Sequence, residues 1–115
     1  MRKPLPHPLE HHPAFRAIIA AATPLAELAQ SCRDRELFSR LAIACGDLAL
    51  GFGAAPGTPA RQRAHHRAWA QVRDLDRAIM GVRINRRAPA AVVGRAQRAI
   101  DRADVLISAL PGVLP

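Results

Sequence analysis

The stretch RDRELFSRLAIACGDLALGF, residues 33–52, decides how this chain folds. Its main apolar stripe consists of Leu37, Leu41, Ala44, Leu48 and Phe52. These residues recur at three- and four-residue intervals, so they share one face of a helix that advances about 100° per residue. Ile43 and Leu50 lie on nearly the opposite side. So wide an apolar surface predicts a helix that is buried on two sides.

The segment before this stretch, residues 13–30, predicts another helix. Proline is tolerated in a first helical turn, so Pro13 can begin it. Its apolar residues, at three- and four-residue spacing, are Phe15, Ile18, Ile19, Ala22, Leu25, Ala26 and Ala29. Pro24 removes one backbone hydrogen bond, which predicts a kink or a division near Thr23.

The segment after it begins with Gly51-Phe52-Gly53 and Pro56-Gly57, which predict a helix stop and a loop. Thr58 followed by Pro59 then predicts an N-cap and a first helical position. The helix that follows runs to about Val82. Its core stripe is Ala64, Ala68, Val72, Leu75, Ile79 and Val82.

Pro89 begins the last predicted helix, which ends before Pro111-Gly112. Its apolar seam is Val93, Ala96, Ile100, Ala103, Ile107 and Leu110. Four helices with short connections predict an all-α fold, an antiparallel up-down-up-down four-helix bundle over residues 13–110. Residues 1–12, rich in proline and histidine, are expected to form a flexible N-terminal arm, and residues 111–115 a C-terminal tail.

The positive charge is concentrated in residues 54–100, which hold ten arginines against Asp74 and Asp76. The net charge of +8 therefore falls entirely in this segment. Most of its arginines lie opposite the core stripes, so neighbouring helices can join them into one basic surface. The candidate nucleic-acid-binding residues are Arg63, His66, Arg67, Arg73, Arg77, Arg86, Arg87, Arg95, Arg98 and Arg102.

These arginines are either a phosphate-binding surface or an ordinary solvated face. Like charges four residues apart, such as Arg63 and Arg67, each cost a few tenths of a kcal/mol in an isolated helix. A purely structural surface would more often intersperse acids, and Asp74 alone does so here. We therefore favour binding of nucleic acid through phosphates. With few aromatic residues for base stacking, binding should follow shape and backbone, not sequence.

The sequence LFSRLAIACGDLALGFGAA, residues 37–55, resembles the small bacterial four helix bundle proteins. That family includes the protein encoded in intervening sequences of 23S ribosomal RNA and the accessory variability determinant of diversity-generating retroelements. The resemblance continues through residues 68–80 and 100–110. Family members commonly carry a glutamate just before the first glycine of Gly51-Phe52-Gly53, whereas this chain has Leu50.

The resemblance implies a homopentamer with a basic surface that binds DNA, RNA or a hybrid of the two. In the retroelement group it also implies a reverse transcriptase partner. The alternative is a structural or protein-interaction oligomer, of the type encoded in ribosomal RNA intervening sequences, without a nucleic-acid role. The residues expected at an oligomer interface are Ile43, Leu50, Trp69 and Met80. Trp69 fits either a subunit interface or packing on its own bundle.

Other chemistry has little support. Adjacent helical residues diverge by about 100°, so His65 and His66 cannot ligate one metal from a single helix face. We expect no catalytic residues, no metal and no cofactor, because the chain lacks nucleophile and phosphate-loop motifs. Cys32 and Cys45 are expected to be buried free thiols in a reducing compartment. Neither a secretory signal nor a membrane span is apparent, which favours the cytoplasm.

Overall fold

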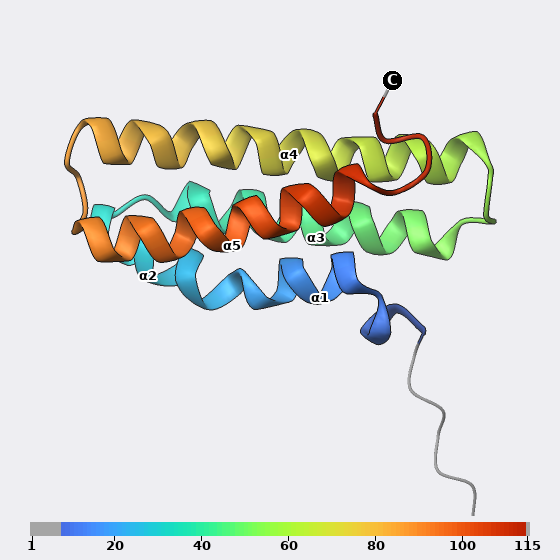
Figure 1. Ribbon diagram of the computed structural model, residues 1–115, viewed down its shortest axis with the longest axis horizontal. Helices are drawn as coiled ribbons and strands as arrows, with labels where there is room; N and C mark the ends of the chain where they lie inside the picture. Colours follow the sequence, from blue (N-terminus) through green and yellow to red (C-terminus); the bar gives the residue numbers. More distant parts are fainter. Residues whose placement is uncertain (1–7, 115) are drawn as a thin grey trace, which may run out of the picture.

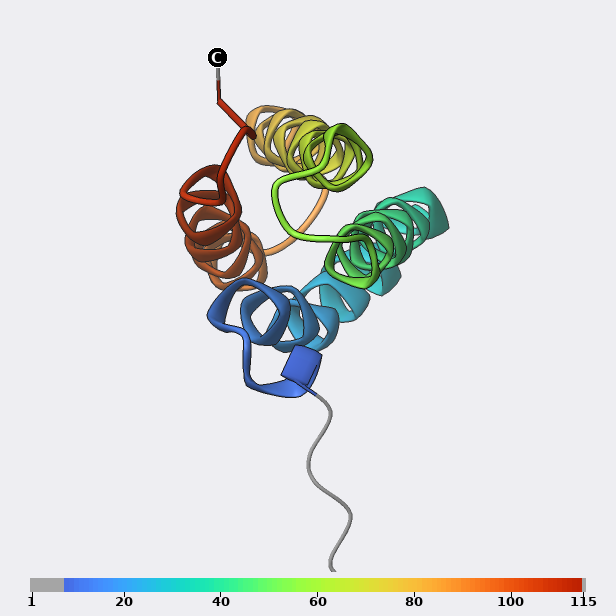
Figure 2. The same cartoon turned by 90° about the vertical axis from the view of Figure 1, so that its right-hand side faces the viewer.

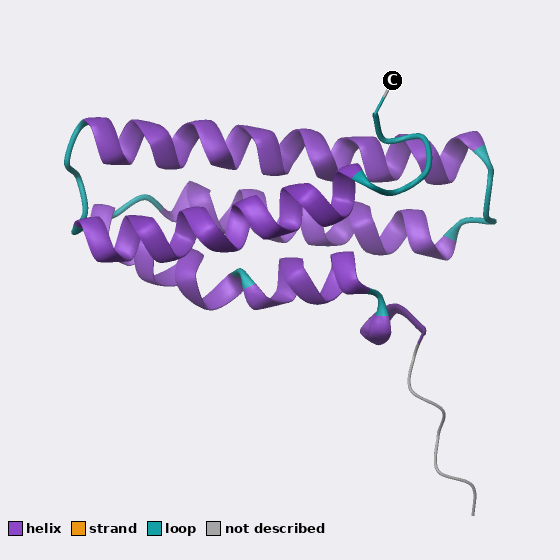
Figure 3. Ribbon diagram, in the orientation of Figure 1, coloured by secondary structure: helices purple, strands orange, loops and turns teal. Residues whose placement is uncertain are grey.

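The computed structural model describes residues 8–114, and every regular element in that range is helical (Figures 1 and 3). The elements are the 3-10 helix η1 (Pro8–His11) and the α-helices α1 (Pro13–Ala20), α2 (Ala22–Cys32), α3 (Arg35–Gly53), α4 (Pro59–Ile84) and α5 (Ala90–Ser108). The predicted all-α class is therefore confirmed for this part of the chain. No helix within it is long and apolar enough to cross a membrane.

The first predicted helix is divided into α1 and α2 at Ala21. Pro24 lies in the first turn of α2, where its missing N–H leaves no intrahelical bond unmade. The division expected near Thr23 is therefore confirmed, although it occurs at Ala21, two residues earlier. The two short helices continue one another as a single rod (Figure 1).

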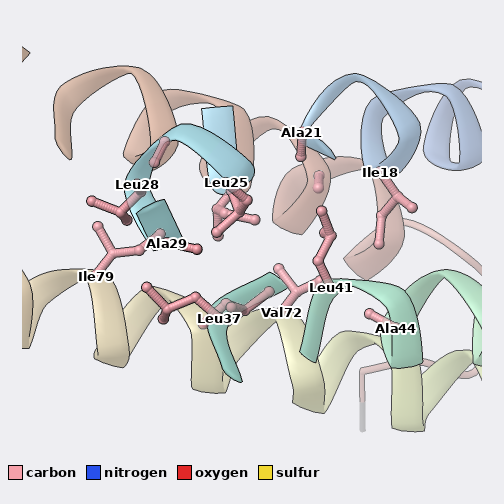
Figure 4. Packing of buried hydrophobic residues seen from close by; sticks show 14 of the residues in the cluster. Ile18, Ala21, Leu25, Leu28, Ala29, Leu37, Leu41, Ala44, Val72 and Ile79 are labelled. Atoms are coloured by element: carbon pink, nitrogen blue, oxygen red, sulfur yellow. The ribbon is translucent and has the colours of Figure 1, made fainter. Parts of the chain in front are cut away.

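Four rods pack side by side around one core. Seen end-on, α4 lies between α3 and α5, and the α1/α2 rod closes the fourth side (Figure 2). Most residues of the expected stripes are buried. Phe15, Ala22, Phe52 and Leu110 are only partly buried, and Ile19 and Ala26 are exposed. Leu25 and Leu28 of α2 point toward Leu37 of α3 and Ile79 of α4 (Figure 4). Each such side chain stabilises the fold by about 1.5–3 kcal/mol through burial.

Local capping explains where the helices begin. Thr58 Oγ1 accepts a hydrogen bond from Arg61 N at 3.3 Å, and Pro59 follows as the first residue of α4. Asp34 Oδ1 accepts from Glu36 N at 3.1 Å, which moves the start of α3 two residues past the expected Arg33. The cap at Thr58 confirms the prediction made from the Thr-Pro pair.

Gly51-Phe52-Gly53 was expected to act as a helix stop, and this interpretation was wrong for Gly51. The helix α3 continues to Gly53, and Gly51 is a buried helical residue. A Cβ atom at position 51 would overlap the imidazole ring of His65 on α4. Gly51 therefore serves close packing between two helices instead of chain reversal.

Both ends of the described chain pack onto the bundle. Of the arm expected over residues 1–12, residues 1–7 lie outside the described range, while Pro8–His11 form η1. The ring of His12 lies 4.3 Å from that of Phe52, between ring centroids. Within the expected tail, Val113 is buried, and Pro115 is not described.

Candidate nucleic-acid interface

The arginines of α4 lie on its solvent side, opposite the core stripe. Arg63, Arg67 and Arg77 are exposed and Arg73 is half-buried, while Ala64, Ala68, Val72 and the rest of the stripe are buried. The helix is long enough to hold these side chains over several turns. The predicted separation of charge and core on this helix is present.

The fold pairs several of these arginines with carboxylates. Arg67 Nε lies 3.4 Å from Asp47 Oδ1 of α3, and Arg73 Nη1 lies 3.3 Å from Asp104 Oδ2 of α5. Arg77 pairs with Asp74 on the same helix, at 3.6 Å. The sequence analysis considered only the acids of this helix. It therefore missed two carboxylate partners, Asp47 and Asp104, which come from neighbouring helices.

A polar seam runs between α4 and α5. Gln97 Nε2 donates to Asp76 Oδ1 and to Asp101 Oδ1, at 2.5 Å and 2.8 Å. Further along, Asp104 accepts from both Trp69 and Arg73. The facing sides of α4 and α5 thus carry three carboxylates. Carboxylates therefore lie between the two helices whose arginines were expected to form one basic surface.

Two arginines of α5, Arg95 and Arg102, lie toward the α1/α2 rod. Arg95 Nη2 donates to Glu27 Oε1 of α2. Arg102 lines a shallow hollow of about 510 Å³ with Arg16 of α1, together with Pro13, Ala17 and Ala20. Arg98 is exposed and forms no ion pair with any described residue. Arg95 and Arg102 thus place positive charge on the side of α5 that borders the α1/α2 rod.

The remaining candidates have distinct surroundings. Arg86 and Arg87 are exposed in the connection between α4 and α5, where Arg87 Nη2 donates to Cys32 O at 3.2 Å. His66 Nδ1 lies 2.9 Å from Val113 O, so with a proton on that nitrogen it donates to the C-terminal segment. His66 therefore contacts the C-terminal segment through Nδ1, and its expected contribution to the basic face remains a prediction.

The residues expected at an oligomer interface differ in their exposure. Ile43 and Leu50 of α3 are 52% and 62% exposed, and Met80 of α4 is 44% exposed. Trp69 is half-buried, and its Nε1 donates to Asp104 Oδ1 at 2.8 Å. Trp69 thus packs against its own bundle, and the subunit interface expected for it remains a prediction. Sequence analysis overlooked the exposed Phe38, Ile84 and Val105.

A buried polar ring escaped the sequence analysis as well. His65 is 1% exposed, and neither of its ring nitrogens has a hydrogen-bond partner of good geometry among the described residues. Its ring packs edge-on against Phe52, with 4.5 Å between centroids, and Arg61 lies over the Phe52 ring. Burial, and then the positive charge of Arg61, lower the pKa of His65, against a smaller opposing effect of the Leu48 backbone.

The two cysteines are free thiols in different surroundings. Cys32 is buried as expected, but Cys45 is only half-buried; neither forms a disulfide. Burial raises the pKa of the Cys45 thiol, which keeps it protonated and poorly nucleophilic at neutral pH. No group of three described His, Cys, Asp or Glu side chains is placed to hold a metal ion.

Comparison of the chain with protein-family models, with curated proteins and with solved structures finds no match. The resemblance to the four helix bundle proteins remains a prediction from the sequence. The functional assignment accordingly depends on the site itself, on its charges, exposure and contacts.

Proposed function

We propose that this protein is a non-catalytic scaffold that binds nucleic acid without sequence specificity. The observation that carries the proposal is the set of exposed arginines that have no carboxylate partner among the described residues, on a chain with a net charge of +8. Of the predicted binding residues, this set comprises Arg63, Arg86, Arg87, Arg98 and Arg102. Guanidinium groups suit phosphates because their donors match two phosphate oxygens at once.

The paired arginines on the exterior remain available to phosphates. The ion pair of Arg77 with Asp74 is solvated on both sides, and that of Arg67 with Asp47 is solvated on the arginine side. Solvent-exposed pairs stabilise a protein by about 0–1 kcal/mol. When an arginine binds a nucleic-acid phosphate instead, the counterions of that phosphate are released. The free energy gained is comparable to that of the ion pair or larger. Arg73 is different, because its partner Asp104 also holds Trp69.

The bundle is proposed to have the antiparallel up-down-up-down order and to assemble into a homo-oligomer. Support for the order comes from the connections, since that between α3 and α4 lies at the opposite end from that between α4 and α5 (Figure 1). Support for assembly comes from Ile43 and Leu50, which are apolar and exposed on one helix. The family resemblance favours a pentamer, and a reverse transcriptase as protein partner.

A structural or protein-interaction oligomer without a nucleic-acid role is the second candidate. The observation in its favour is that Arg67, Arg73, Arg77 and Arg95 each lie beside a carboxylate of the same chain. Under this alternative, the arginines keep the protein soluble and fix neighbouring helices to one another.

Titration of a fluorescent 20-base-pair duplex at several salt concentrations separates the two candidates. Binding through about six phosphates should weaken by roughly a thousandfold between 50 and 200 mM monovalent salt. Two duplexes of unrelated sequence should bind equally, because the contacts are to the backbone. The absence of binding even at low ionic strength, where such contacts are strongest, would leave only the second candidate.

A further inference from the structure

One end of the bundle collects five exposed arginines, which we call the end cluster: Arg33, Arg35, Arg83, Arg86 and Arg87. They come from the α2–α3 and α4–α5 connections and the adjoining helix turns. Both connections lie at the same end, on the left in Figure 1. The hydrogen bond from Arg87 Nη2 to Cys32 O joins the two connections directly.

The end cluster has an excess of positive charge, with five arginines against two acids close in the sequence. Those acids, Asp34 and Glu36, form their contacts with other groups. Asp34 caps α3, and Glu36 pairs with Arg40 at 3.7 Å. The first turn of α5 carries no acid. Within residues 8–114, none of the five arginines forms an ion pair. The arginines of the helix flanks, by contrast, mostly have carboxylate neighbours.

The backbone places two of these arginines where glycine is usual. Arg33 has φ of 55° and Arg86 has φ of 52°, and they are the two non-glycine residues with positive φ in the described chain. In both turns the backbone N–H of the next residue donates a hydrogen bond to the carbonyl oxygen five residues earlier. These bonds run from Asp34 N to Ala29 O and from Arg87 N to Val82 O. This is the Schellman helix end, whose left-handed residue is most often glycine.

Compensation of helix dipoles explains only part of the cluster. A cation near the C-terminus of α2 or α4 is favourable, which accounts for positive charge at Arg33, Arg83, Arg86 and Arg87. Arg35 is the first residue of α3, where a positive charge opposes the dipole. Nor does the dipole require arginine at the left-handed positions. The chain uses glycine for positive φ elsewhere, at Gly57 and Gly112.

Each connection also borders a hollow with arginines at its rim. Arg83 and Arg86 line one of about 510 Å³, whose other walls are Ala88, Ala90 and Val93. Arg33 and Arg35 line another of about 710 Å³ between α2 and α3. Its other walls are Ala26, Ala29, Gln30, Phe38 and Ser39. Neither set of lining residues includes a carboxylate, so both hollows suit an anionic group.

We infer that the end cluster is the principal phosphate-binding site of the protein, with successive phosphates of one nucleic acid seated at the Arg83/Arg86 and Arg33/Arg35 pairs. This inference rests on the proposed function and locates its contact surface. The nucleic acid crosses the end of the bundle instead of lying along α4 and α5. The flank arginines then contribute long-range attraction with few direct contacts.

The test compares two variants that remove the same charge. The end variant is Arg33→Gly/Arg83→Ala/Arg86→Gly, and the flank variant is Arg63→Ala/Arg77→Ala/Arg98→Ala. Both are titrated with the 20-base-pair duplex across a salt series. For the end variant we expect affinity at low salt to fall by more than about tenfold and the salt slope by about three, since each lost phosphate contact lowers the slope by about one. The flank variant should lose less than about threefold.

The end variant is chosen so that it remains folded, because glycine readily adopts the positive φ of positions 33 and 86. The end variant should therefore keep or raise the thermal midpoint while losing affinity. An equal or larger loss in the flank variant would overturn the inference and leave the proposed function standing. If the unmodified protein does not bind at low salt, the proposed function fails, and the inference with it.

Discussion

Gly51 of α3 and His65 of α4 are packed so closely that no side chain larger than hydrogen fits at position 51. The first prediction is that Gly51→Ala lowers the free energy of unfolding by about 1–2 kcal/mol. The added methyl forces the ring or the helix to shift, which outweighs the roughly 1 kcal/mol that alanine gains over glycine in a helix. Urea denaturation measures the change.

Gly46 provides the matched control on the same helix. It is exposed, and a Cβ there would meet nothing within 4 Å. Gly46→Ala should therefore raise the free energy of unfolding by about 0.5–1 kcal/mol. Equal stabilisation by both substitutions would show that the contact between Gly51 and His65 is not tight.

The second prediction is that the protein loses stability at acidic pH. His65 and His12 have lowered pKa values, mainly through burial, and the nearby charged group is Arg61. The unfolded chain binds these protons more readily than the folded protein does. The contribution of the two neutral histidines to the free energy of unfolding is therefore fully present above the ordinary pKa of 6.5 and is lost as the pH falls below it. His12 must also be neutral at Nδ1 to accept from Ala14 N. Each proton accounts for a slope of up to about 1.4 kcal/mol per pH unit.

Denaturation midpoints at pH 7.5, 6.5 and 5.5 measure this loss. His65→Met keeps a similar volume without a titrating group, so its stability should fall less steeply than that of the unmodified protein. His11→Ala, at an exposed position, should follow the unmodified protein. If the His65→Met curve is as steep as the original, His65 does not contribute to the pH dependence.

The third prediction concerns Asp104, which accepts hydrogen bonds from Trp69 and Arg73 at once. Asp104→Leu should lower the free energy of unfolding by about 1–3 kcal/mol, because it leaves the indole N–H without an acceptor. Asp104→Asn retains an oxygen for Trp69 and should cost less. In a Trp69→Phe background, the effect of Asp104→Leu should shrink by about 1 kcal/mol. Purely additive effects would show that this bond does not stabilise the fold.

How far the sequence predicted these features depends on the range of the interactions. The core stripe of α4 and the cap at Thr58 follow from residues close together in the chain, so spacing and composition identified both. The contact between Gly51 and His65 depends on two helices, and glycine content alone could only indicate a stop.

The candidate site shows the same distinction. Exposure of Arg63 and Arg67 was predictable from the 3.6-residue period of one helix. Partners such as Asp47 and Asp104 were not, because they come from other helices and their approach depends on how the helices pack. The left-handed backbone at Arg33 and Arg86 carries no sequence signal, since glycine, which would reveal it, is absent there.

The last prediction is that Ile43 and Leu50 mediate self-association. Both are more than half exposed on α3, on the side away from its core stripe. Because both side chains are already about half covered, burying the rest of each at an interface yields roughly 1 kcal/mol, and glutamine removes that gain while keeping helix propensity. Light scattering should find an oligomer for the unmodified protein at micromolar concentration and smaller species for Ile43→Gln/Leu50→Gln. Val105→Gln on α5, at a residue 67% exposed, is the control and should leave the mass unchanged. A monomeric unmodified protein would refute the assembly outright, whereas dissociation by Val105→Gln alone would move the interface from α3 to α5.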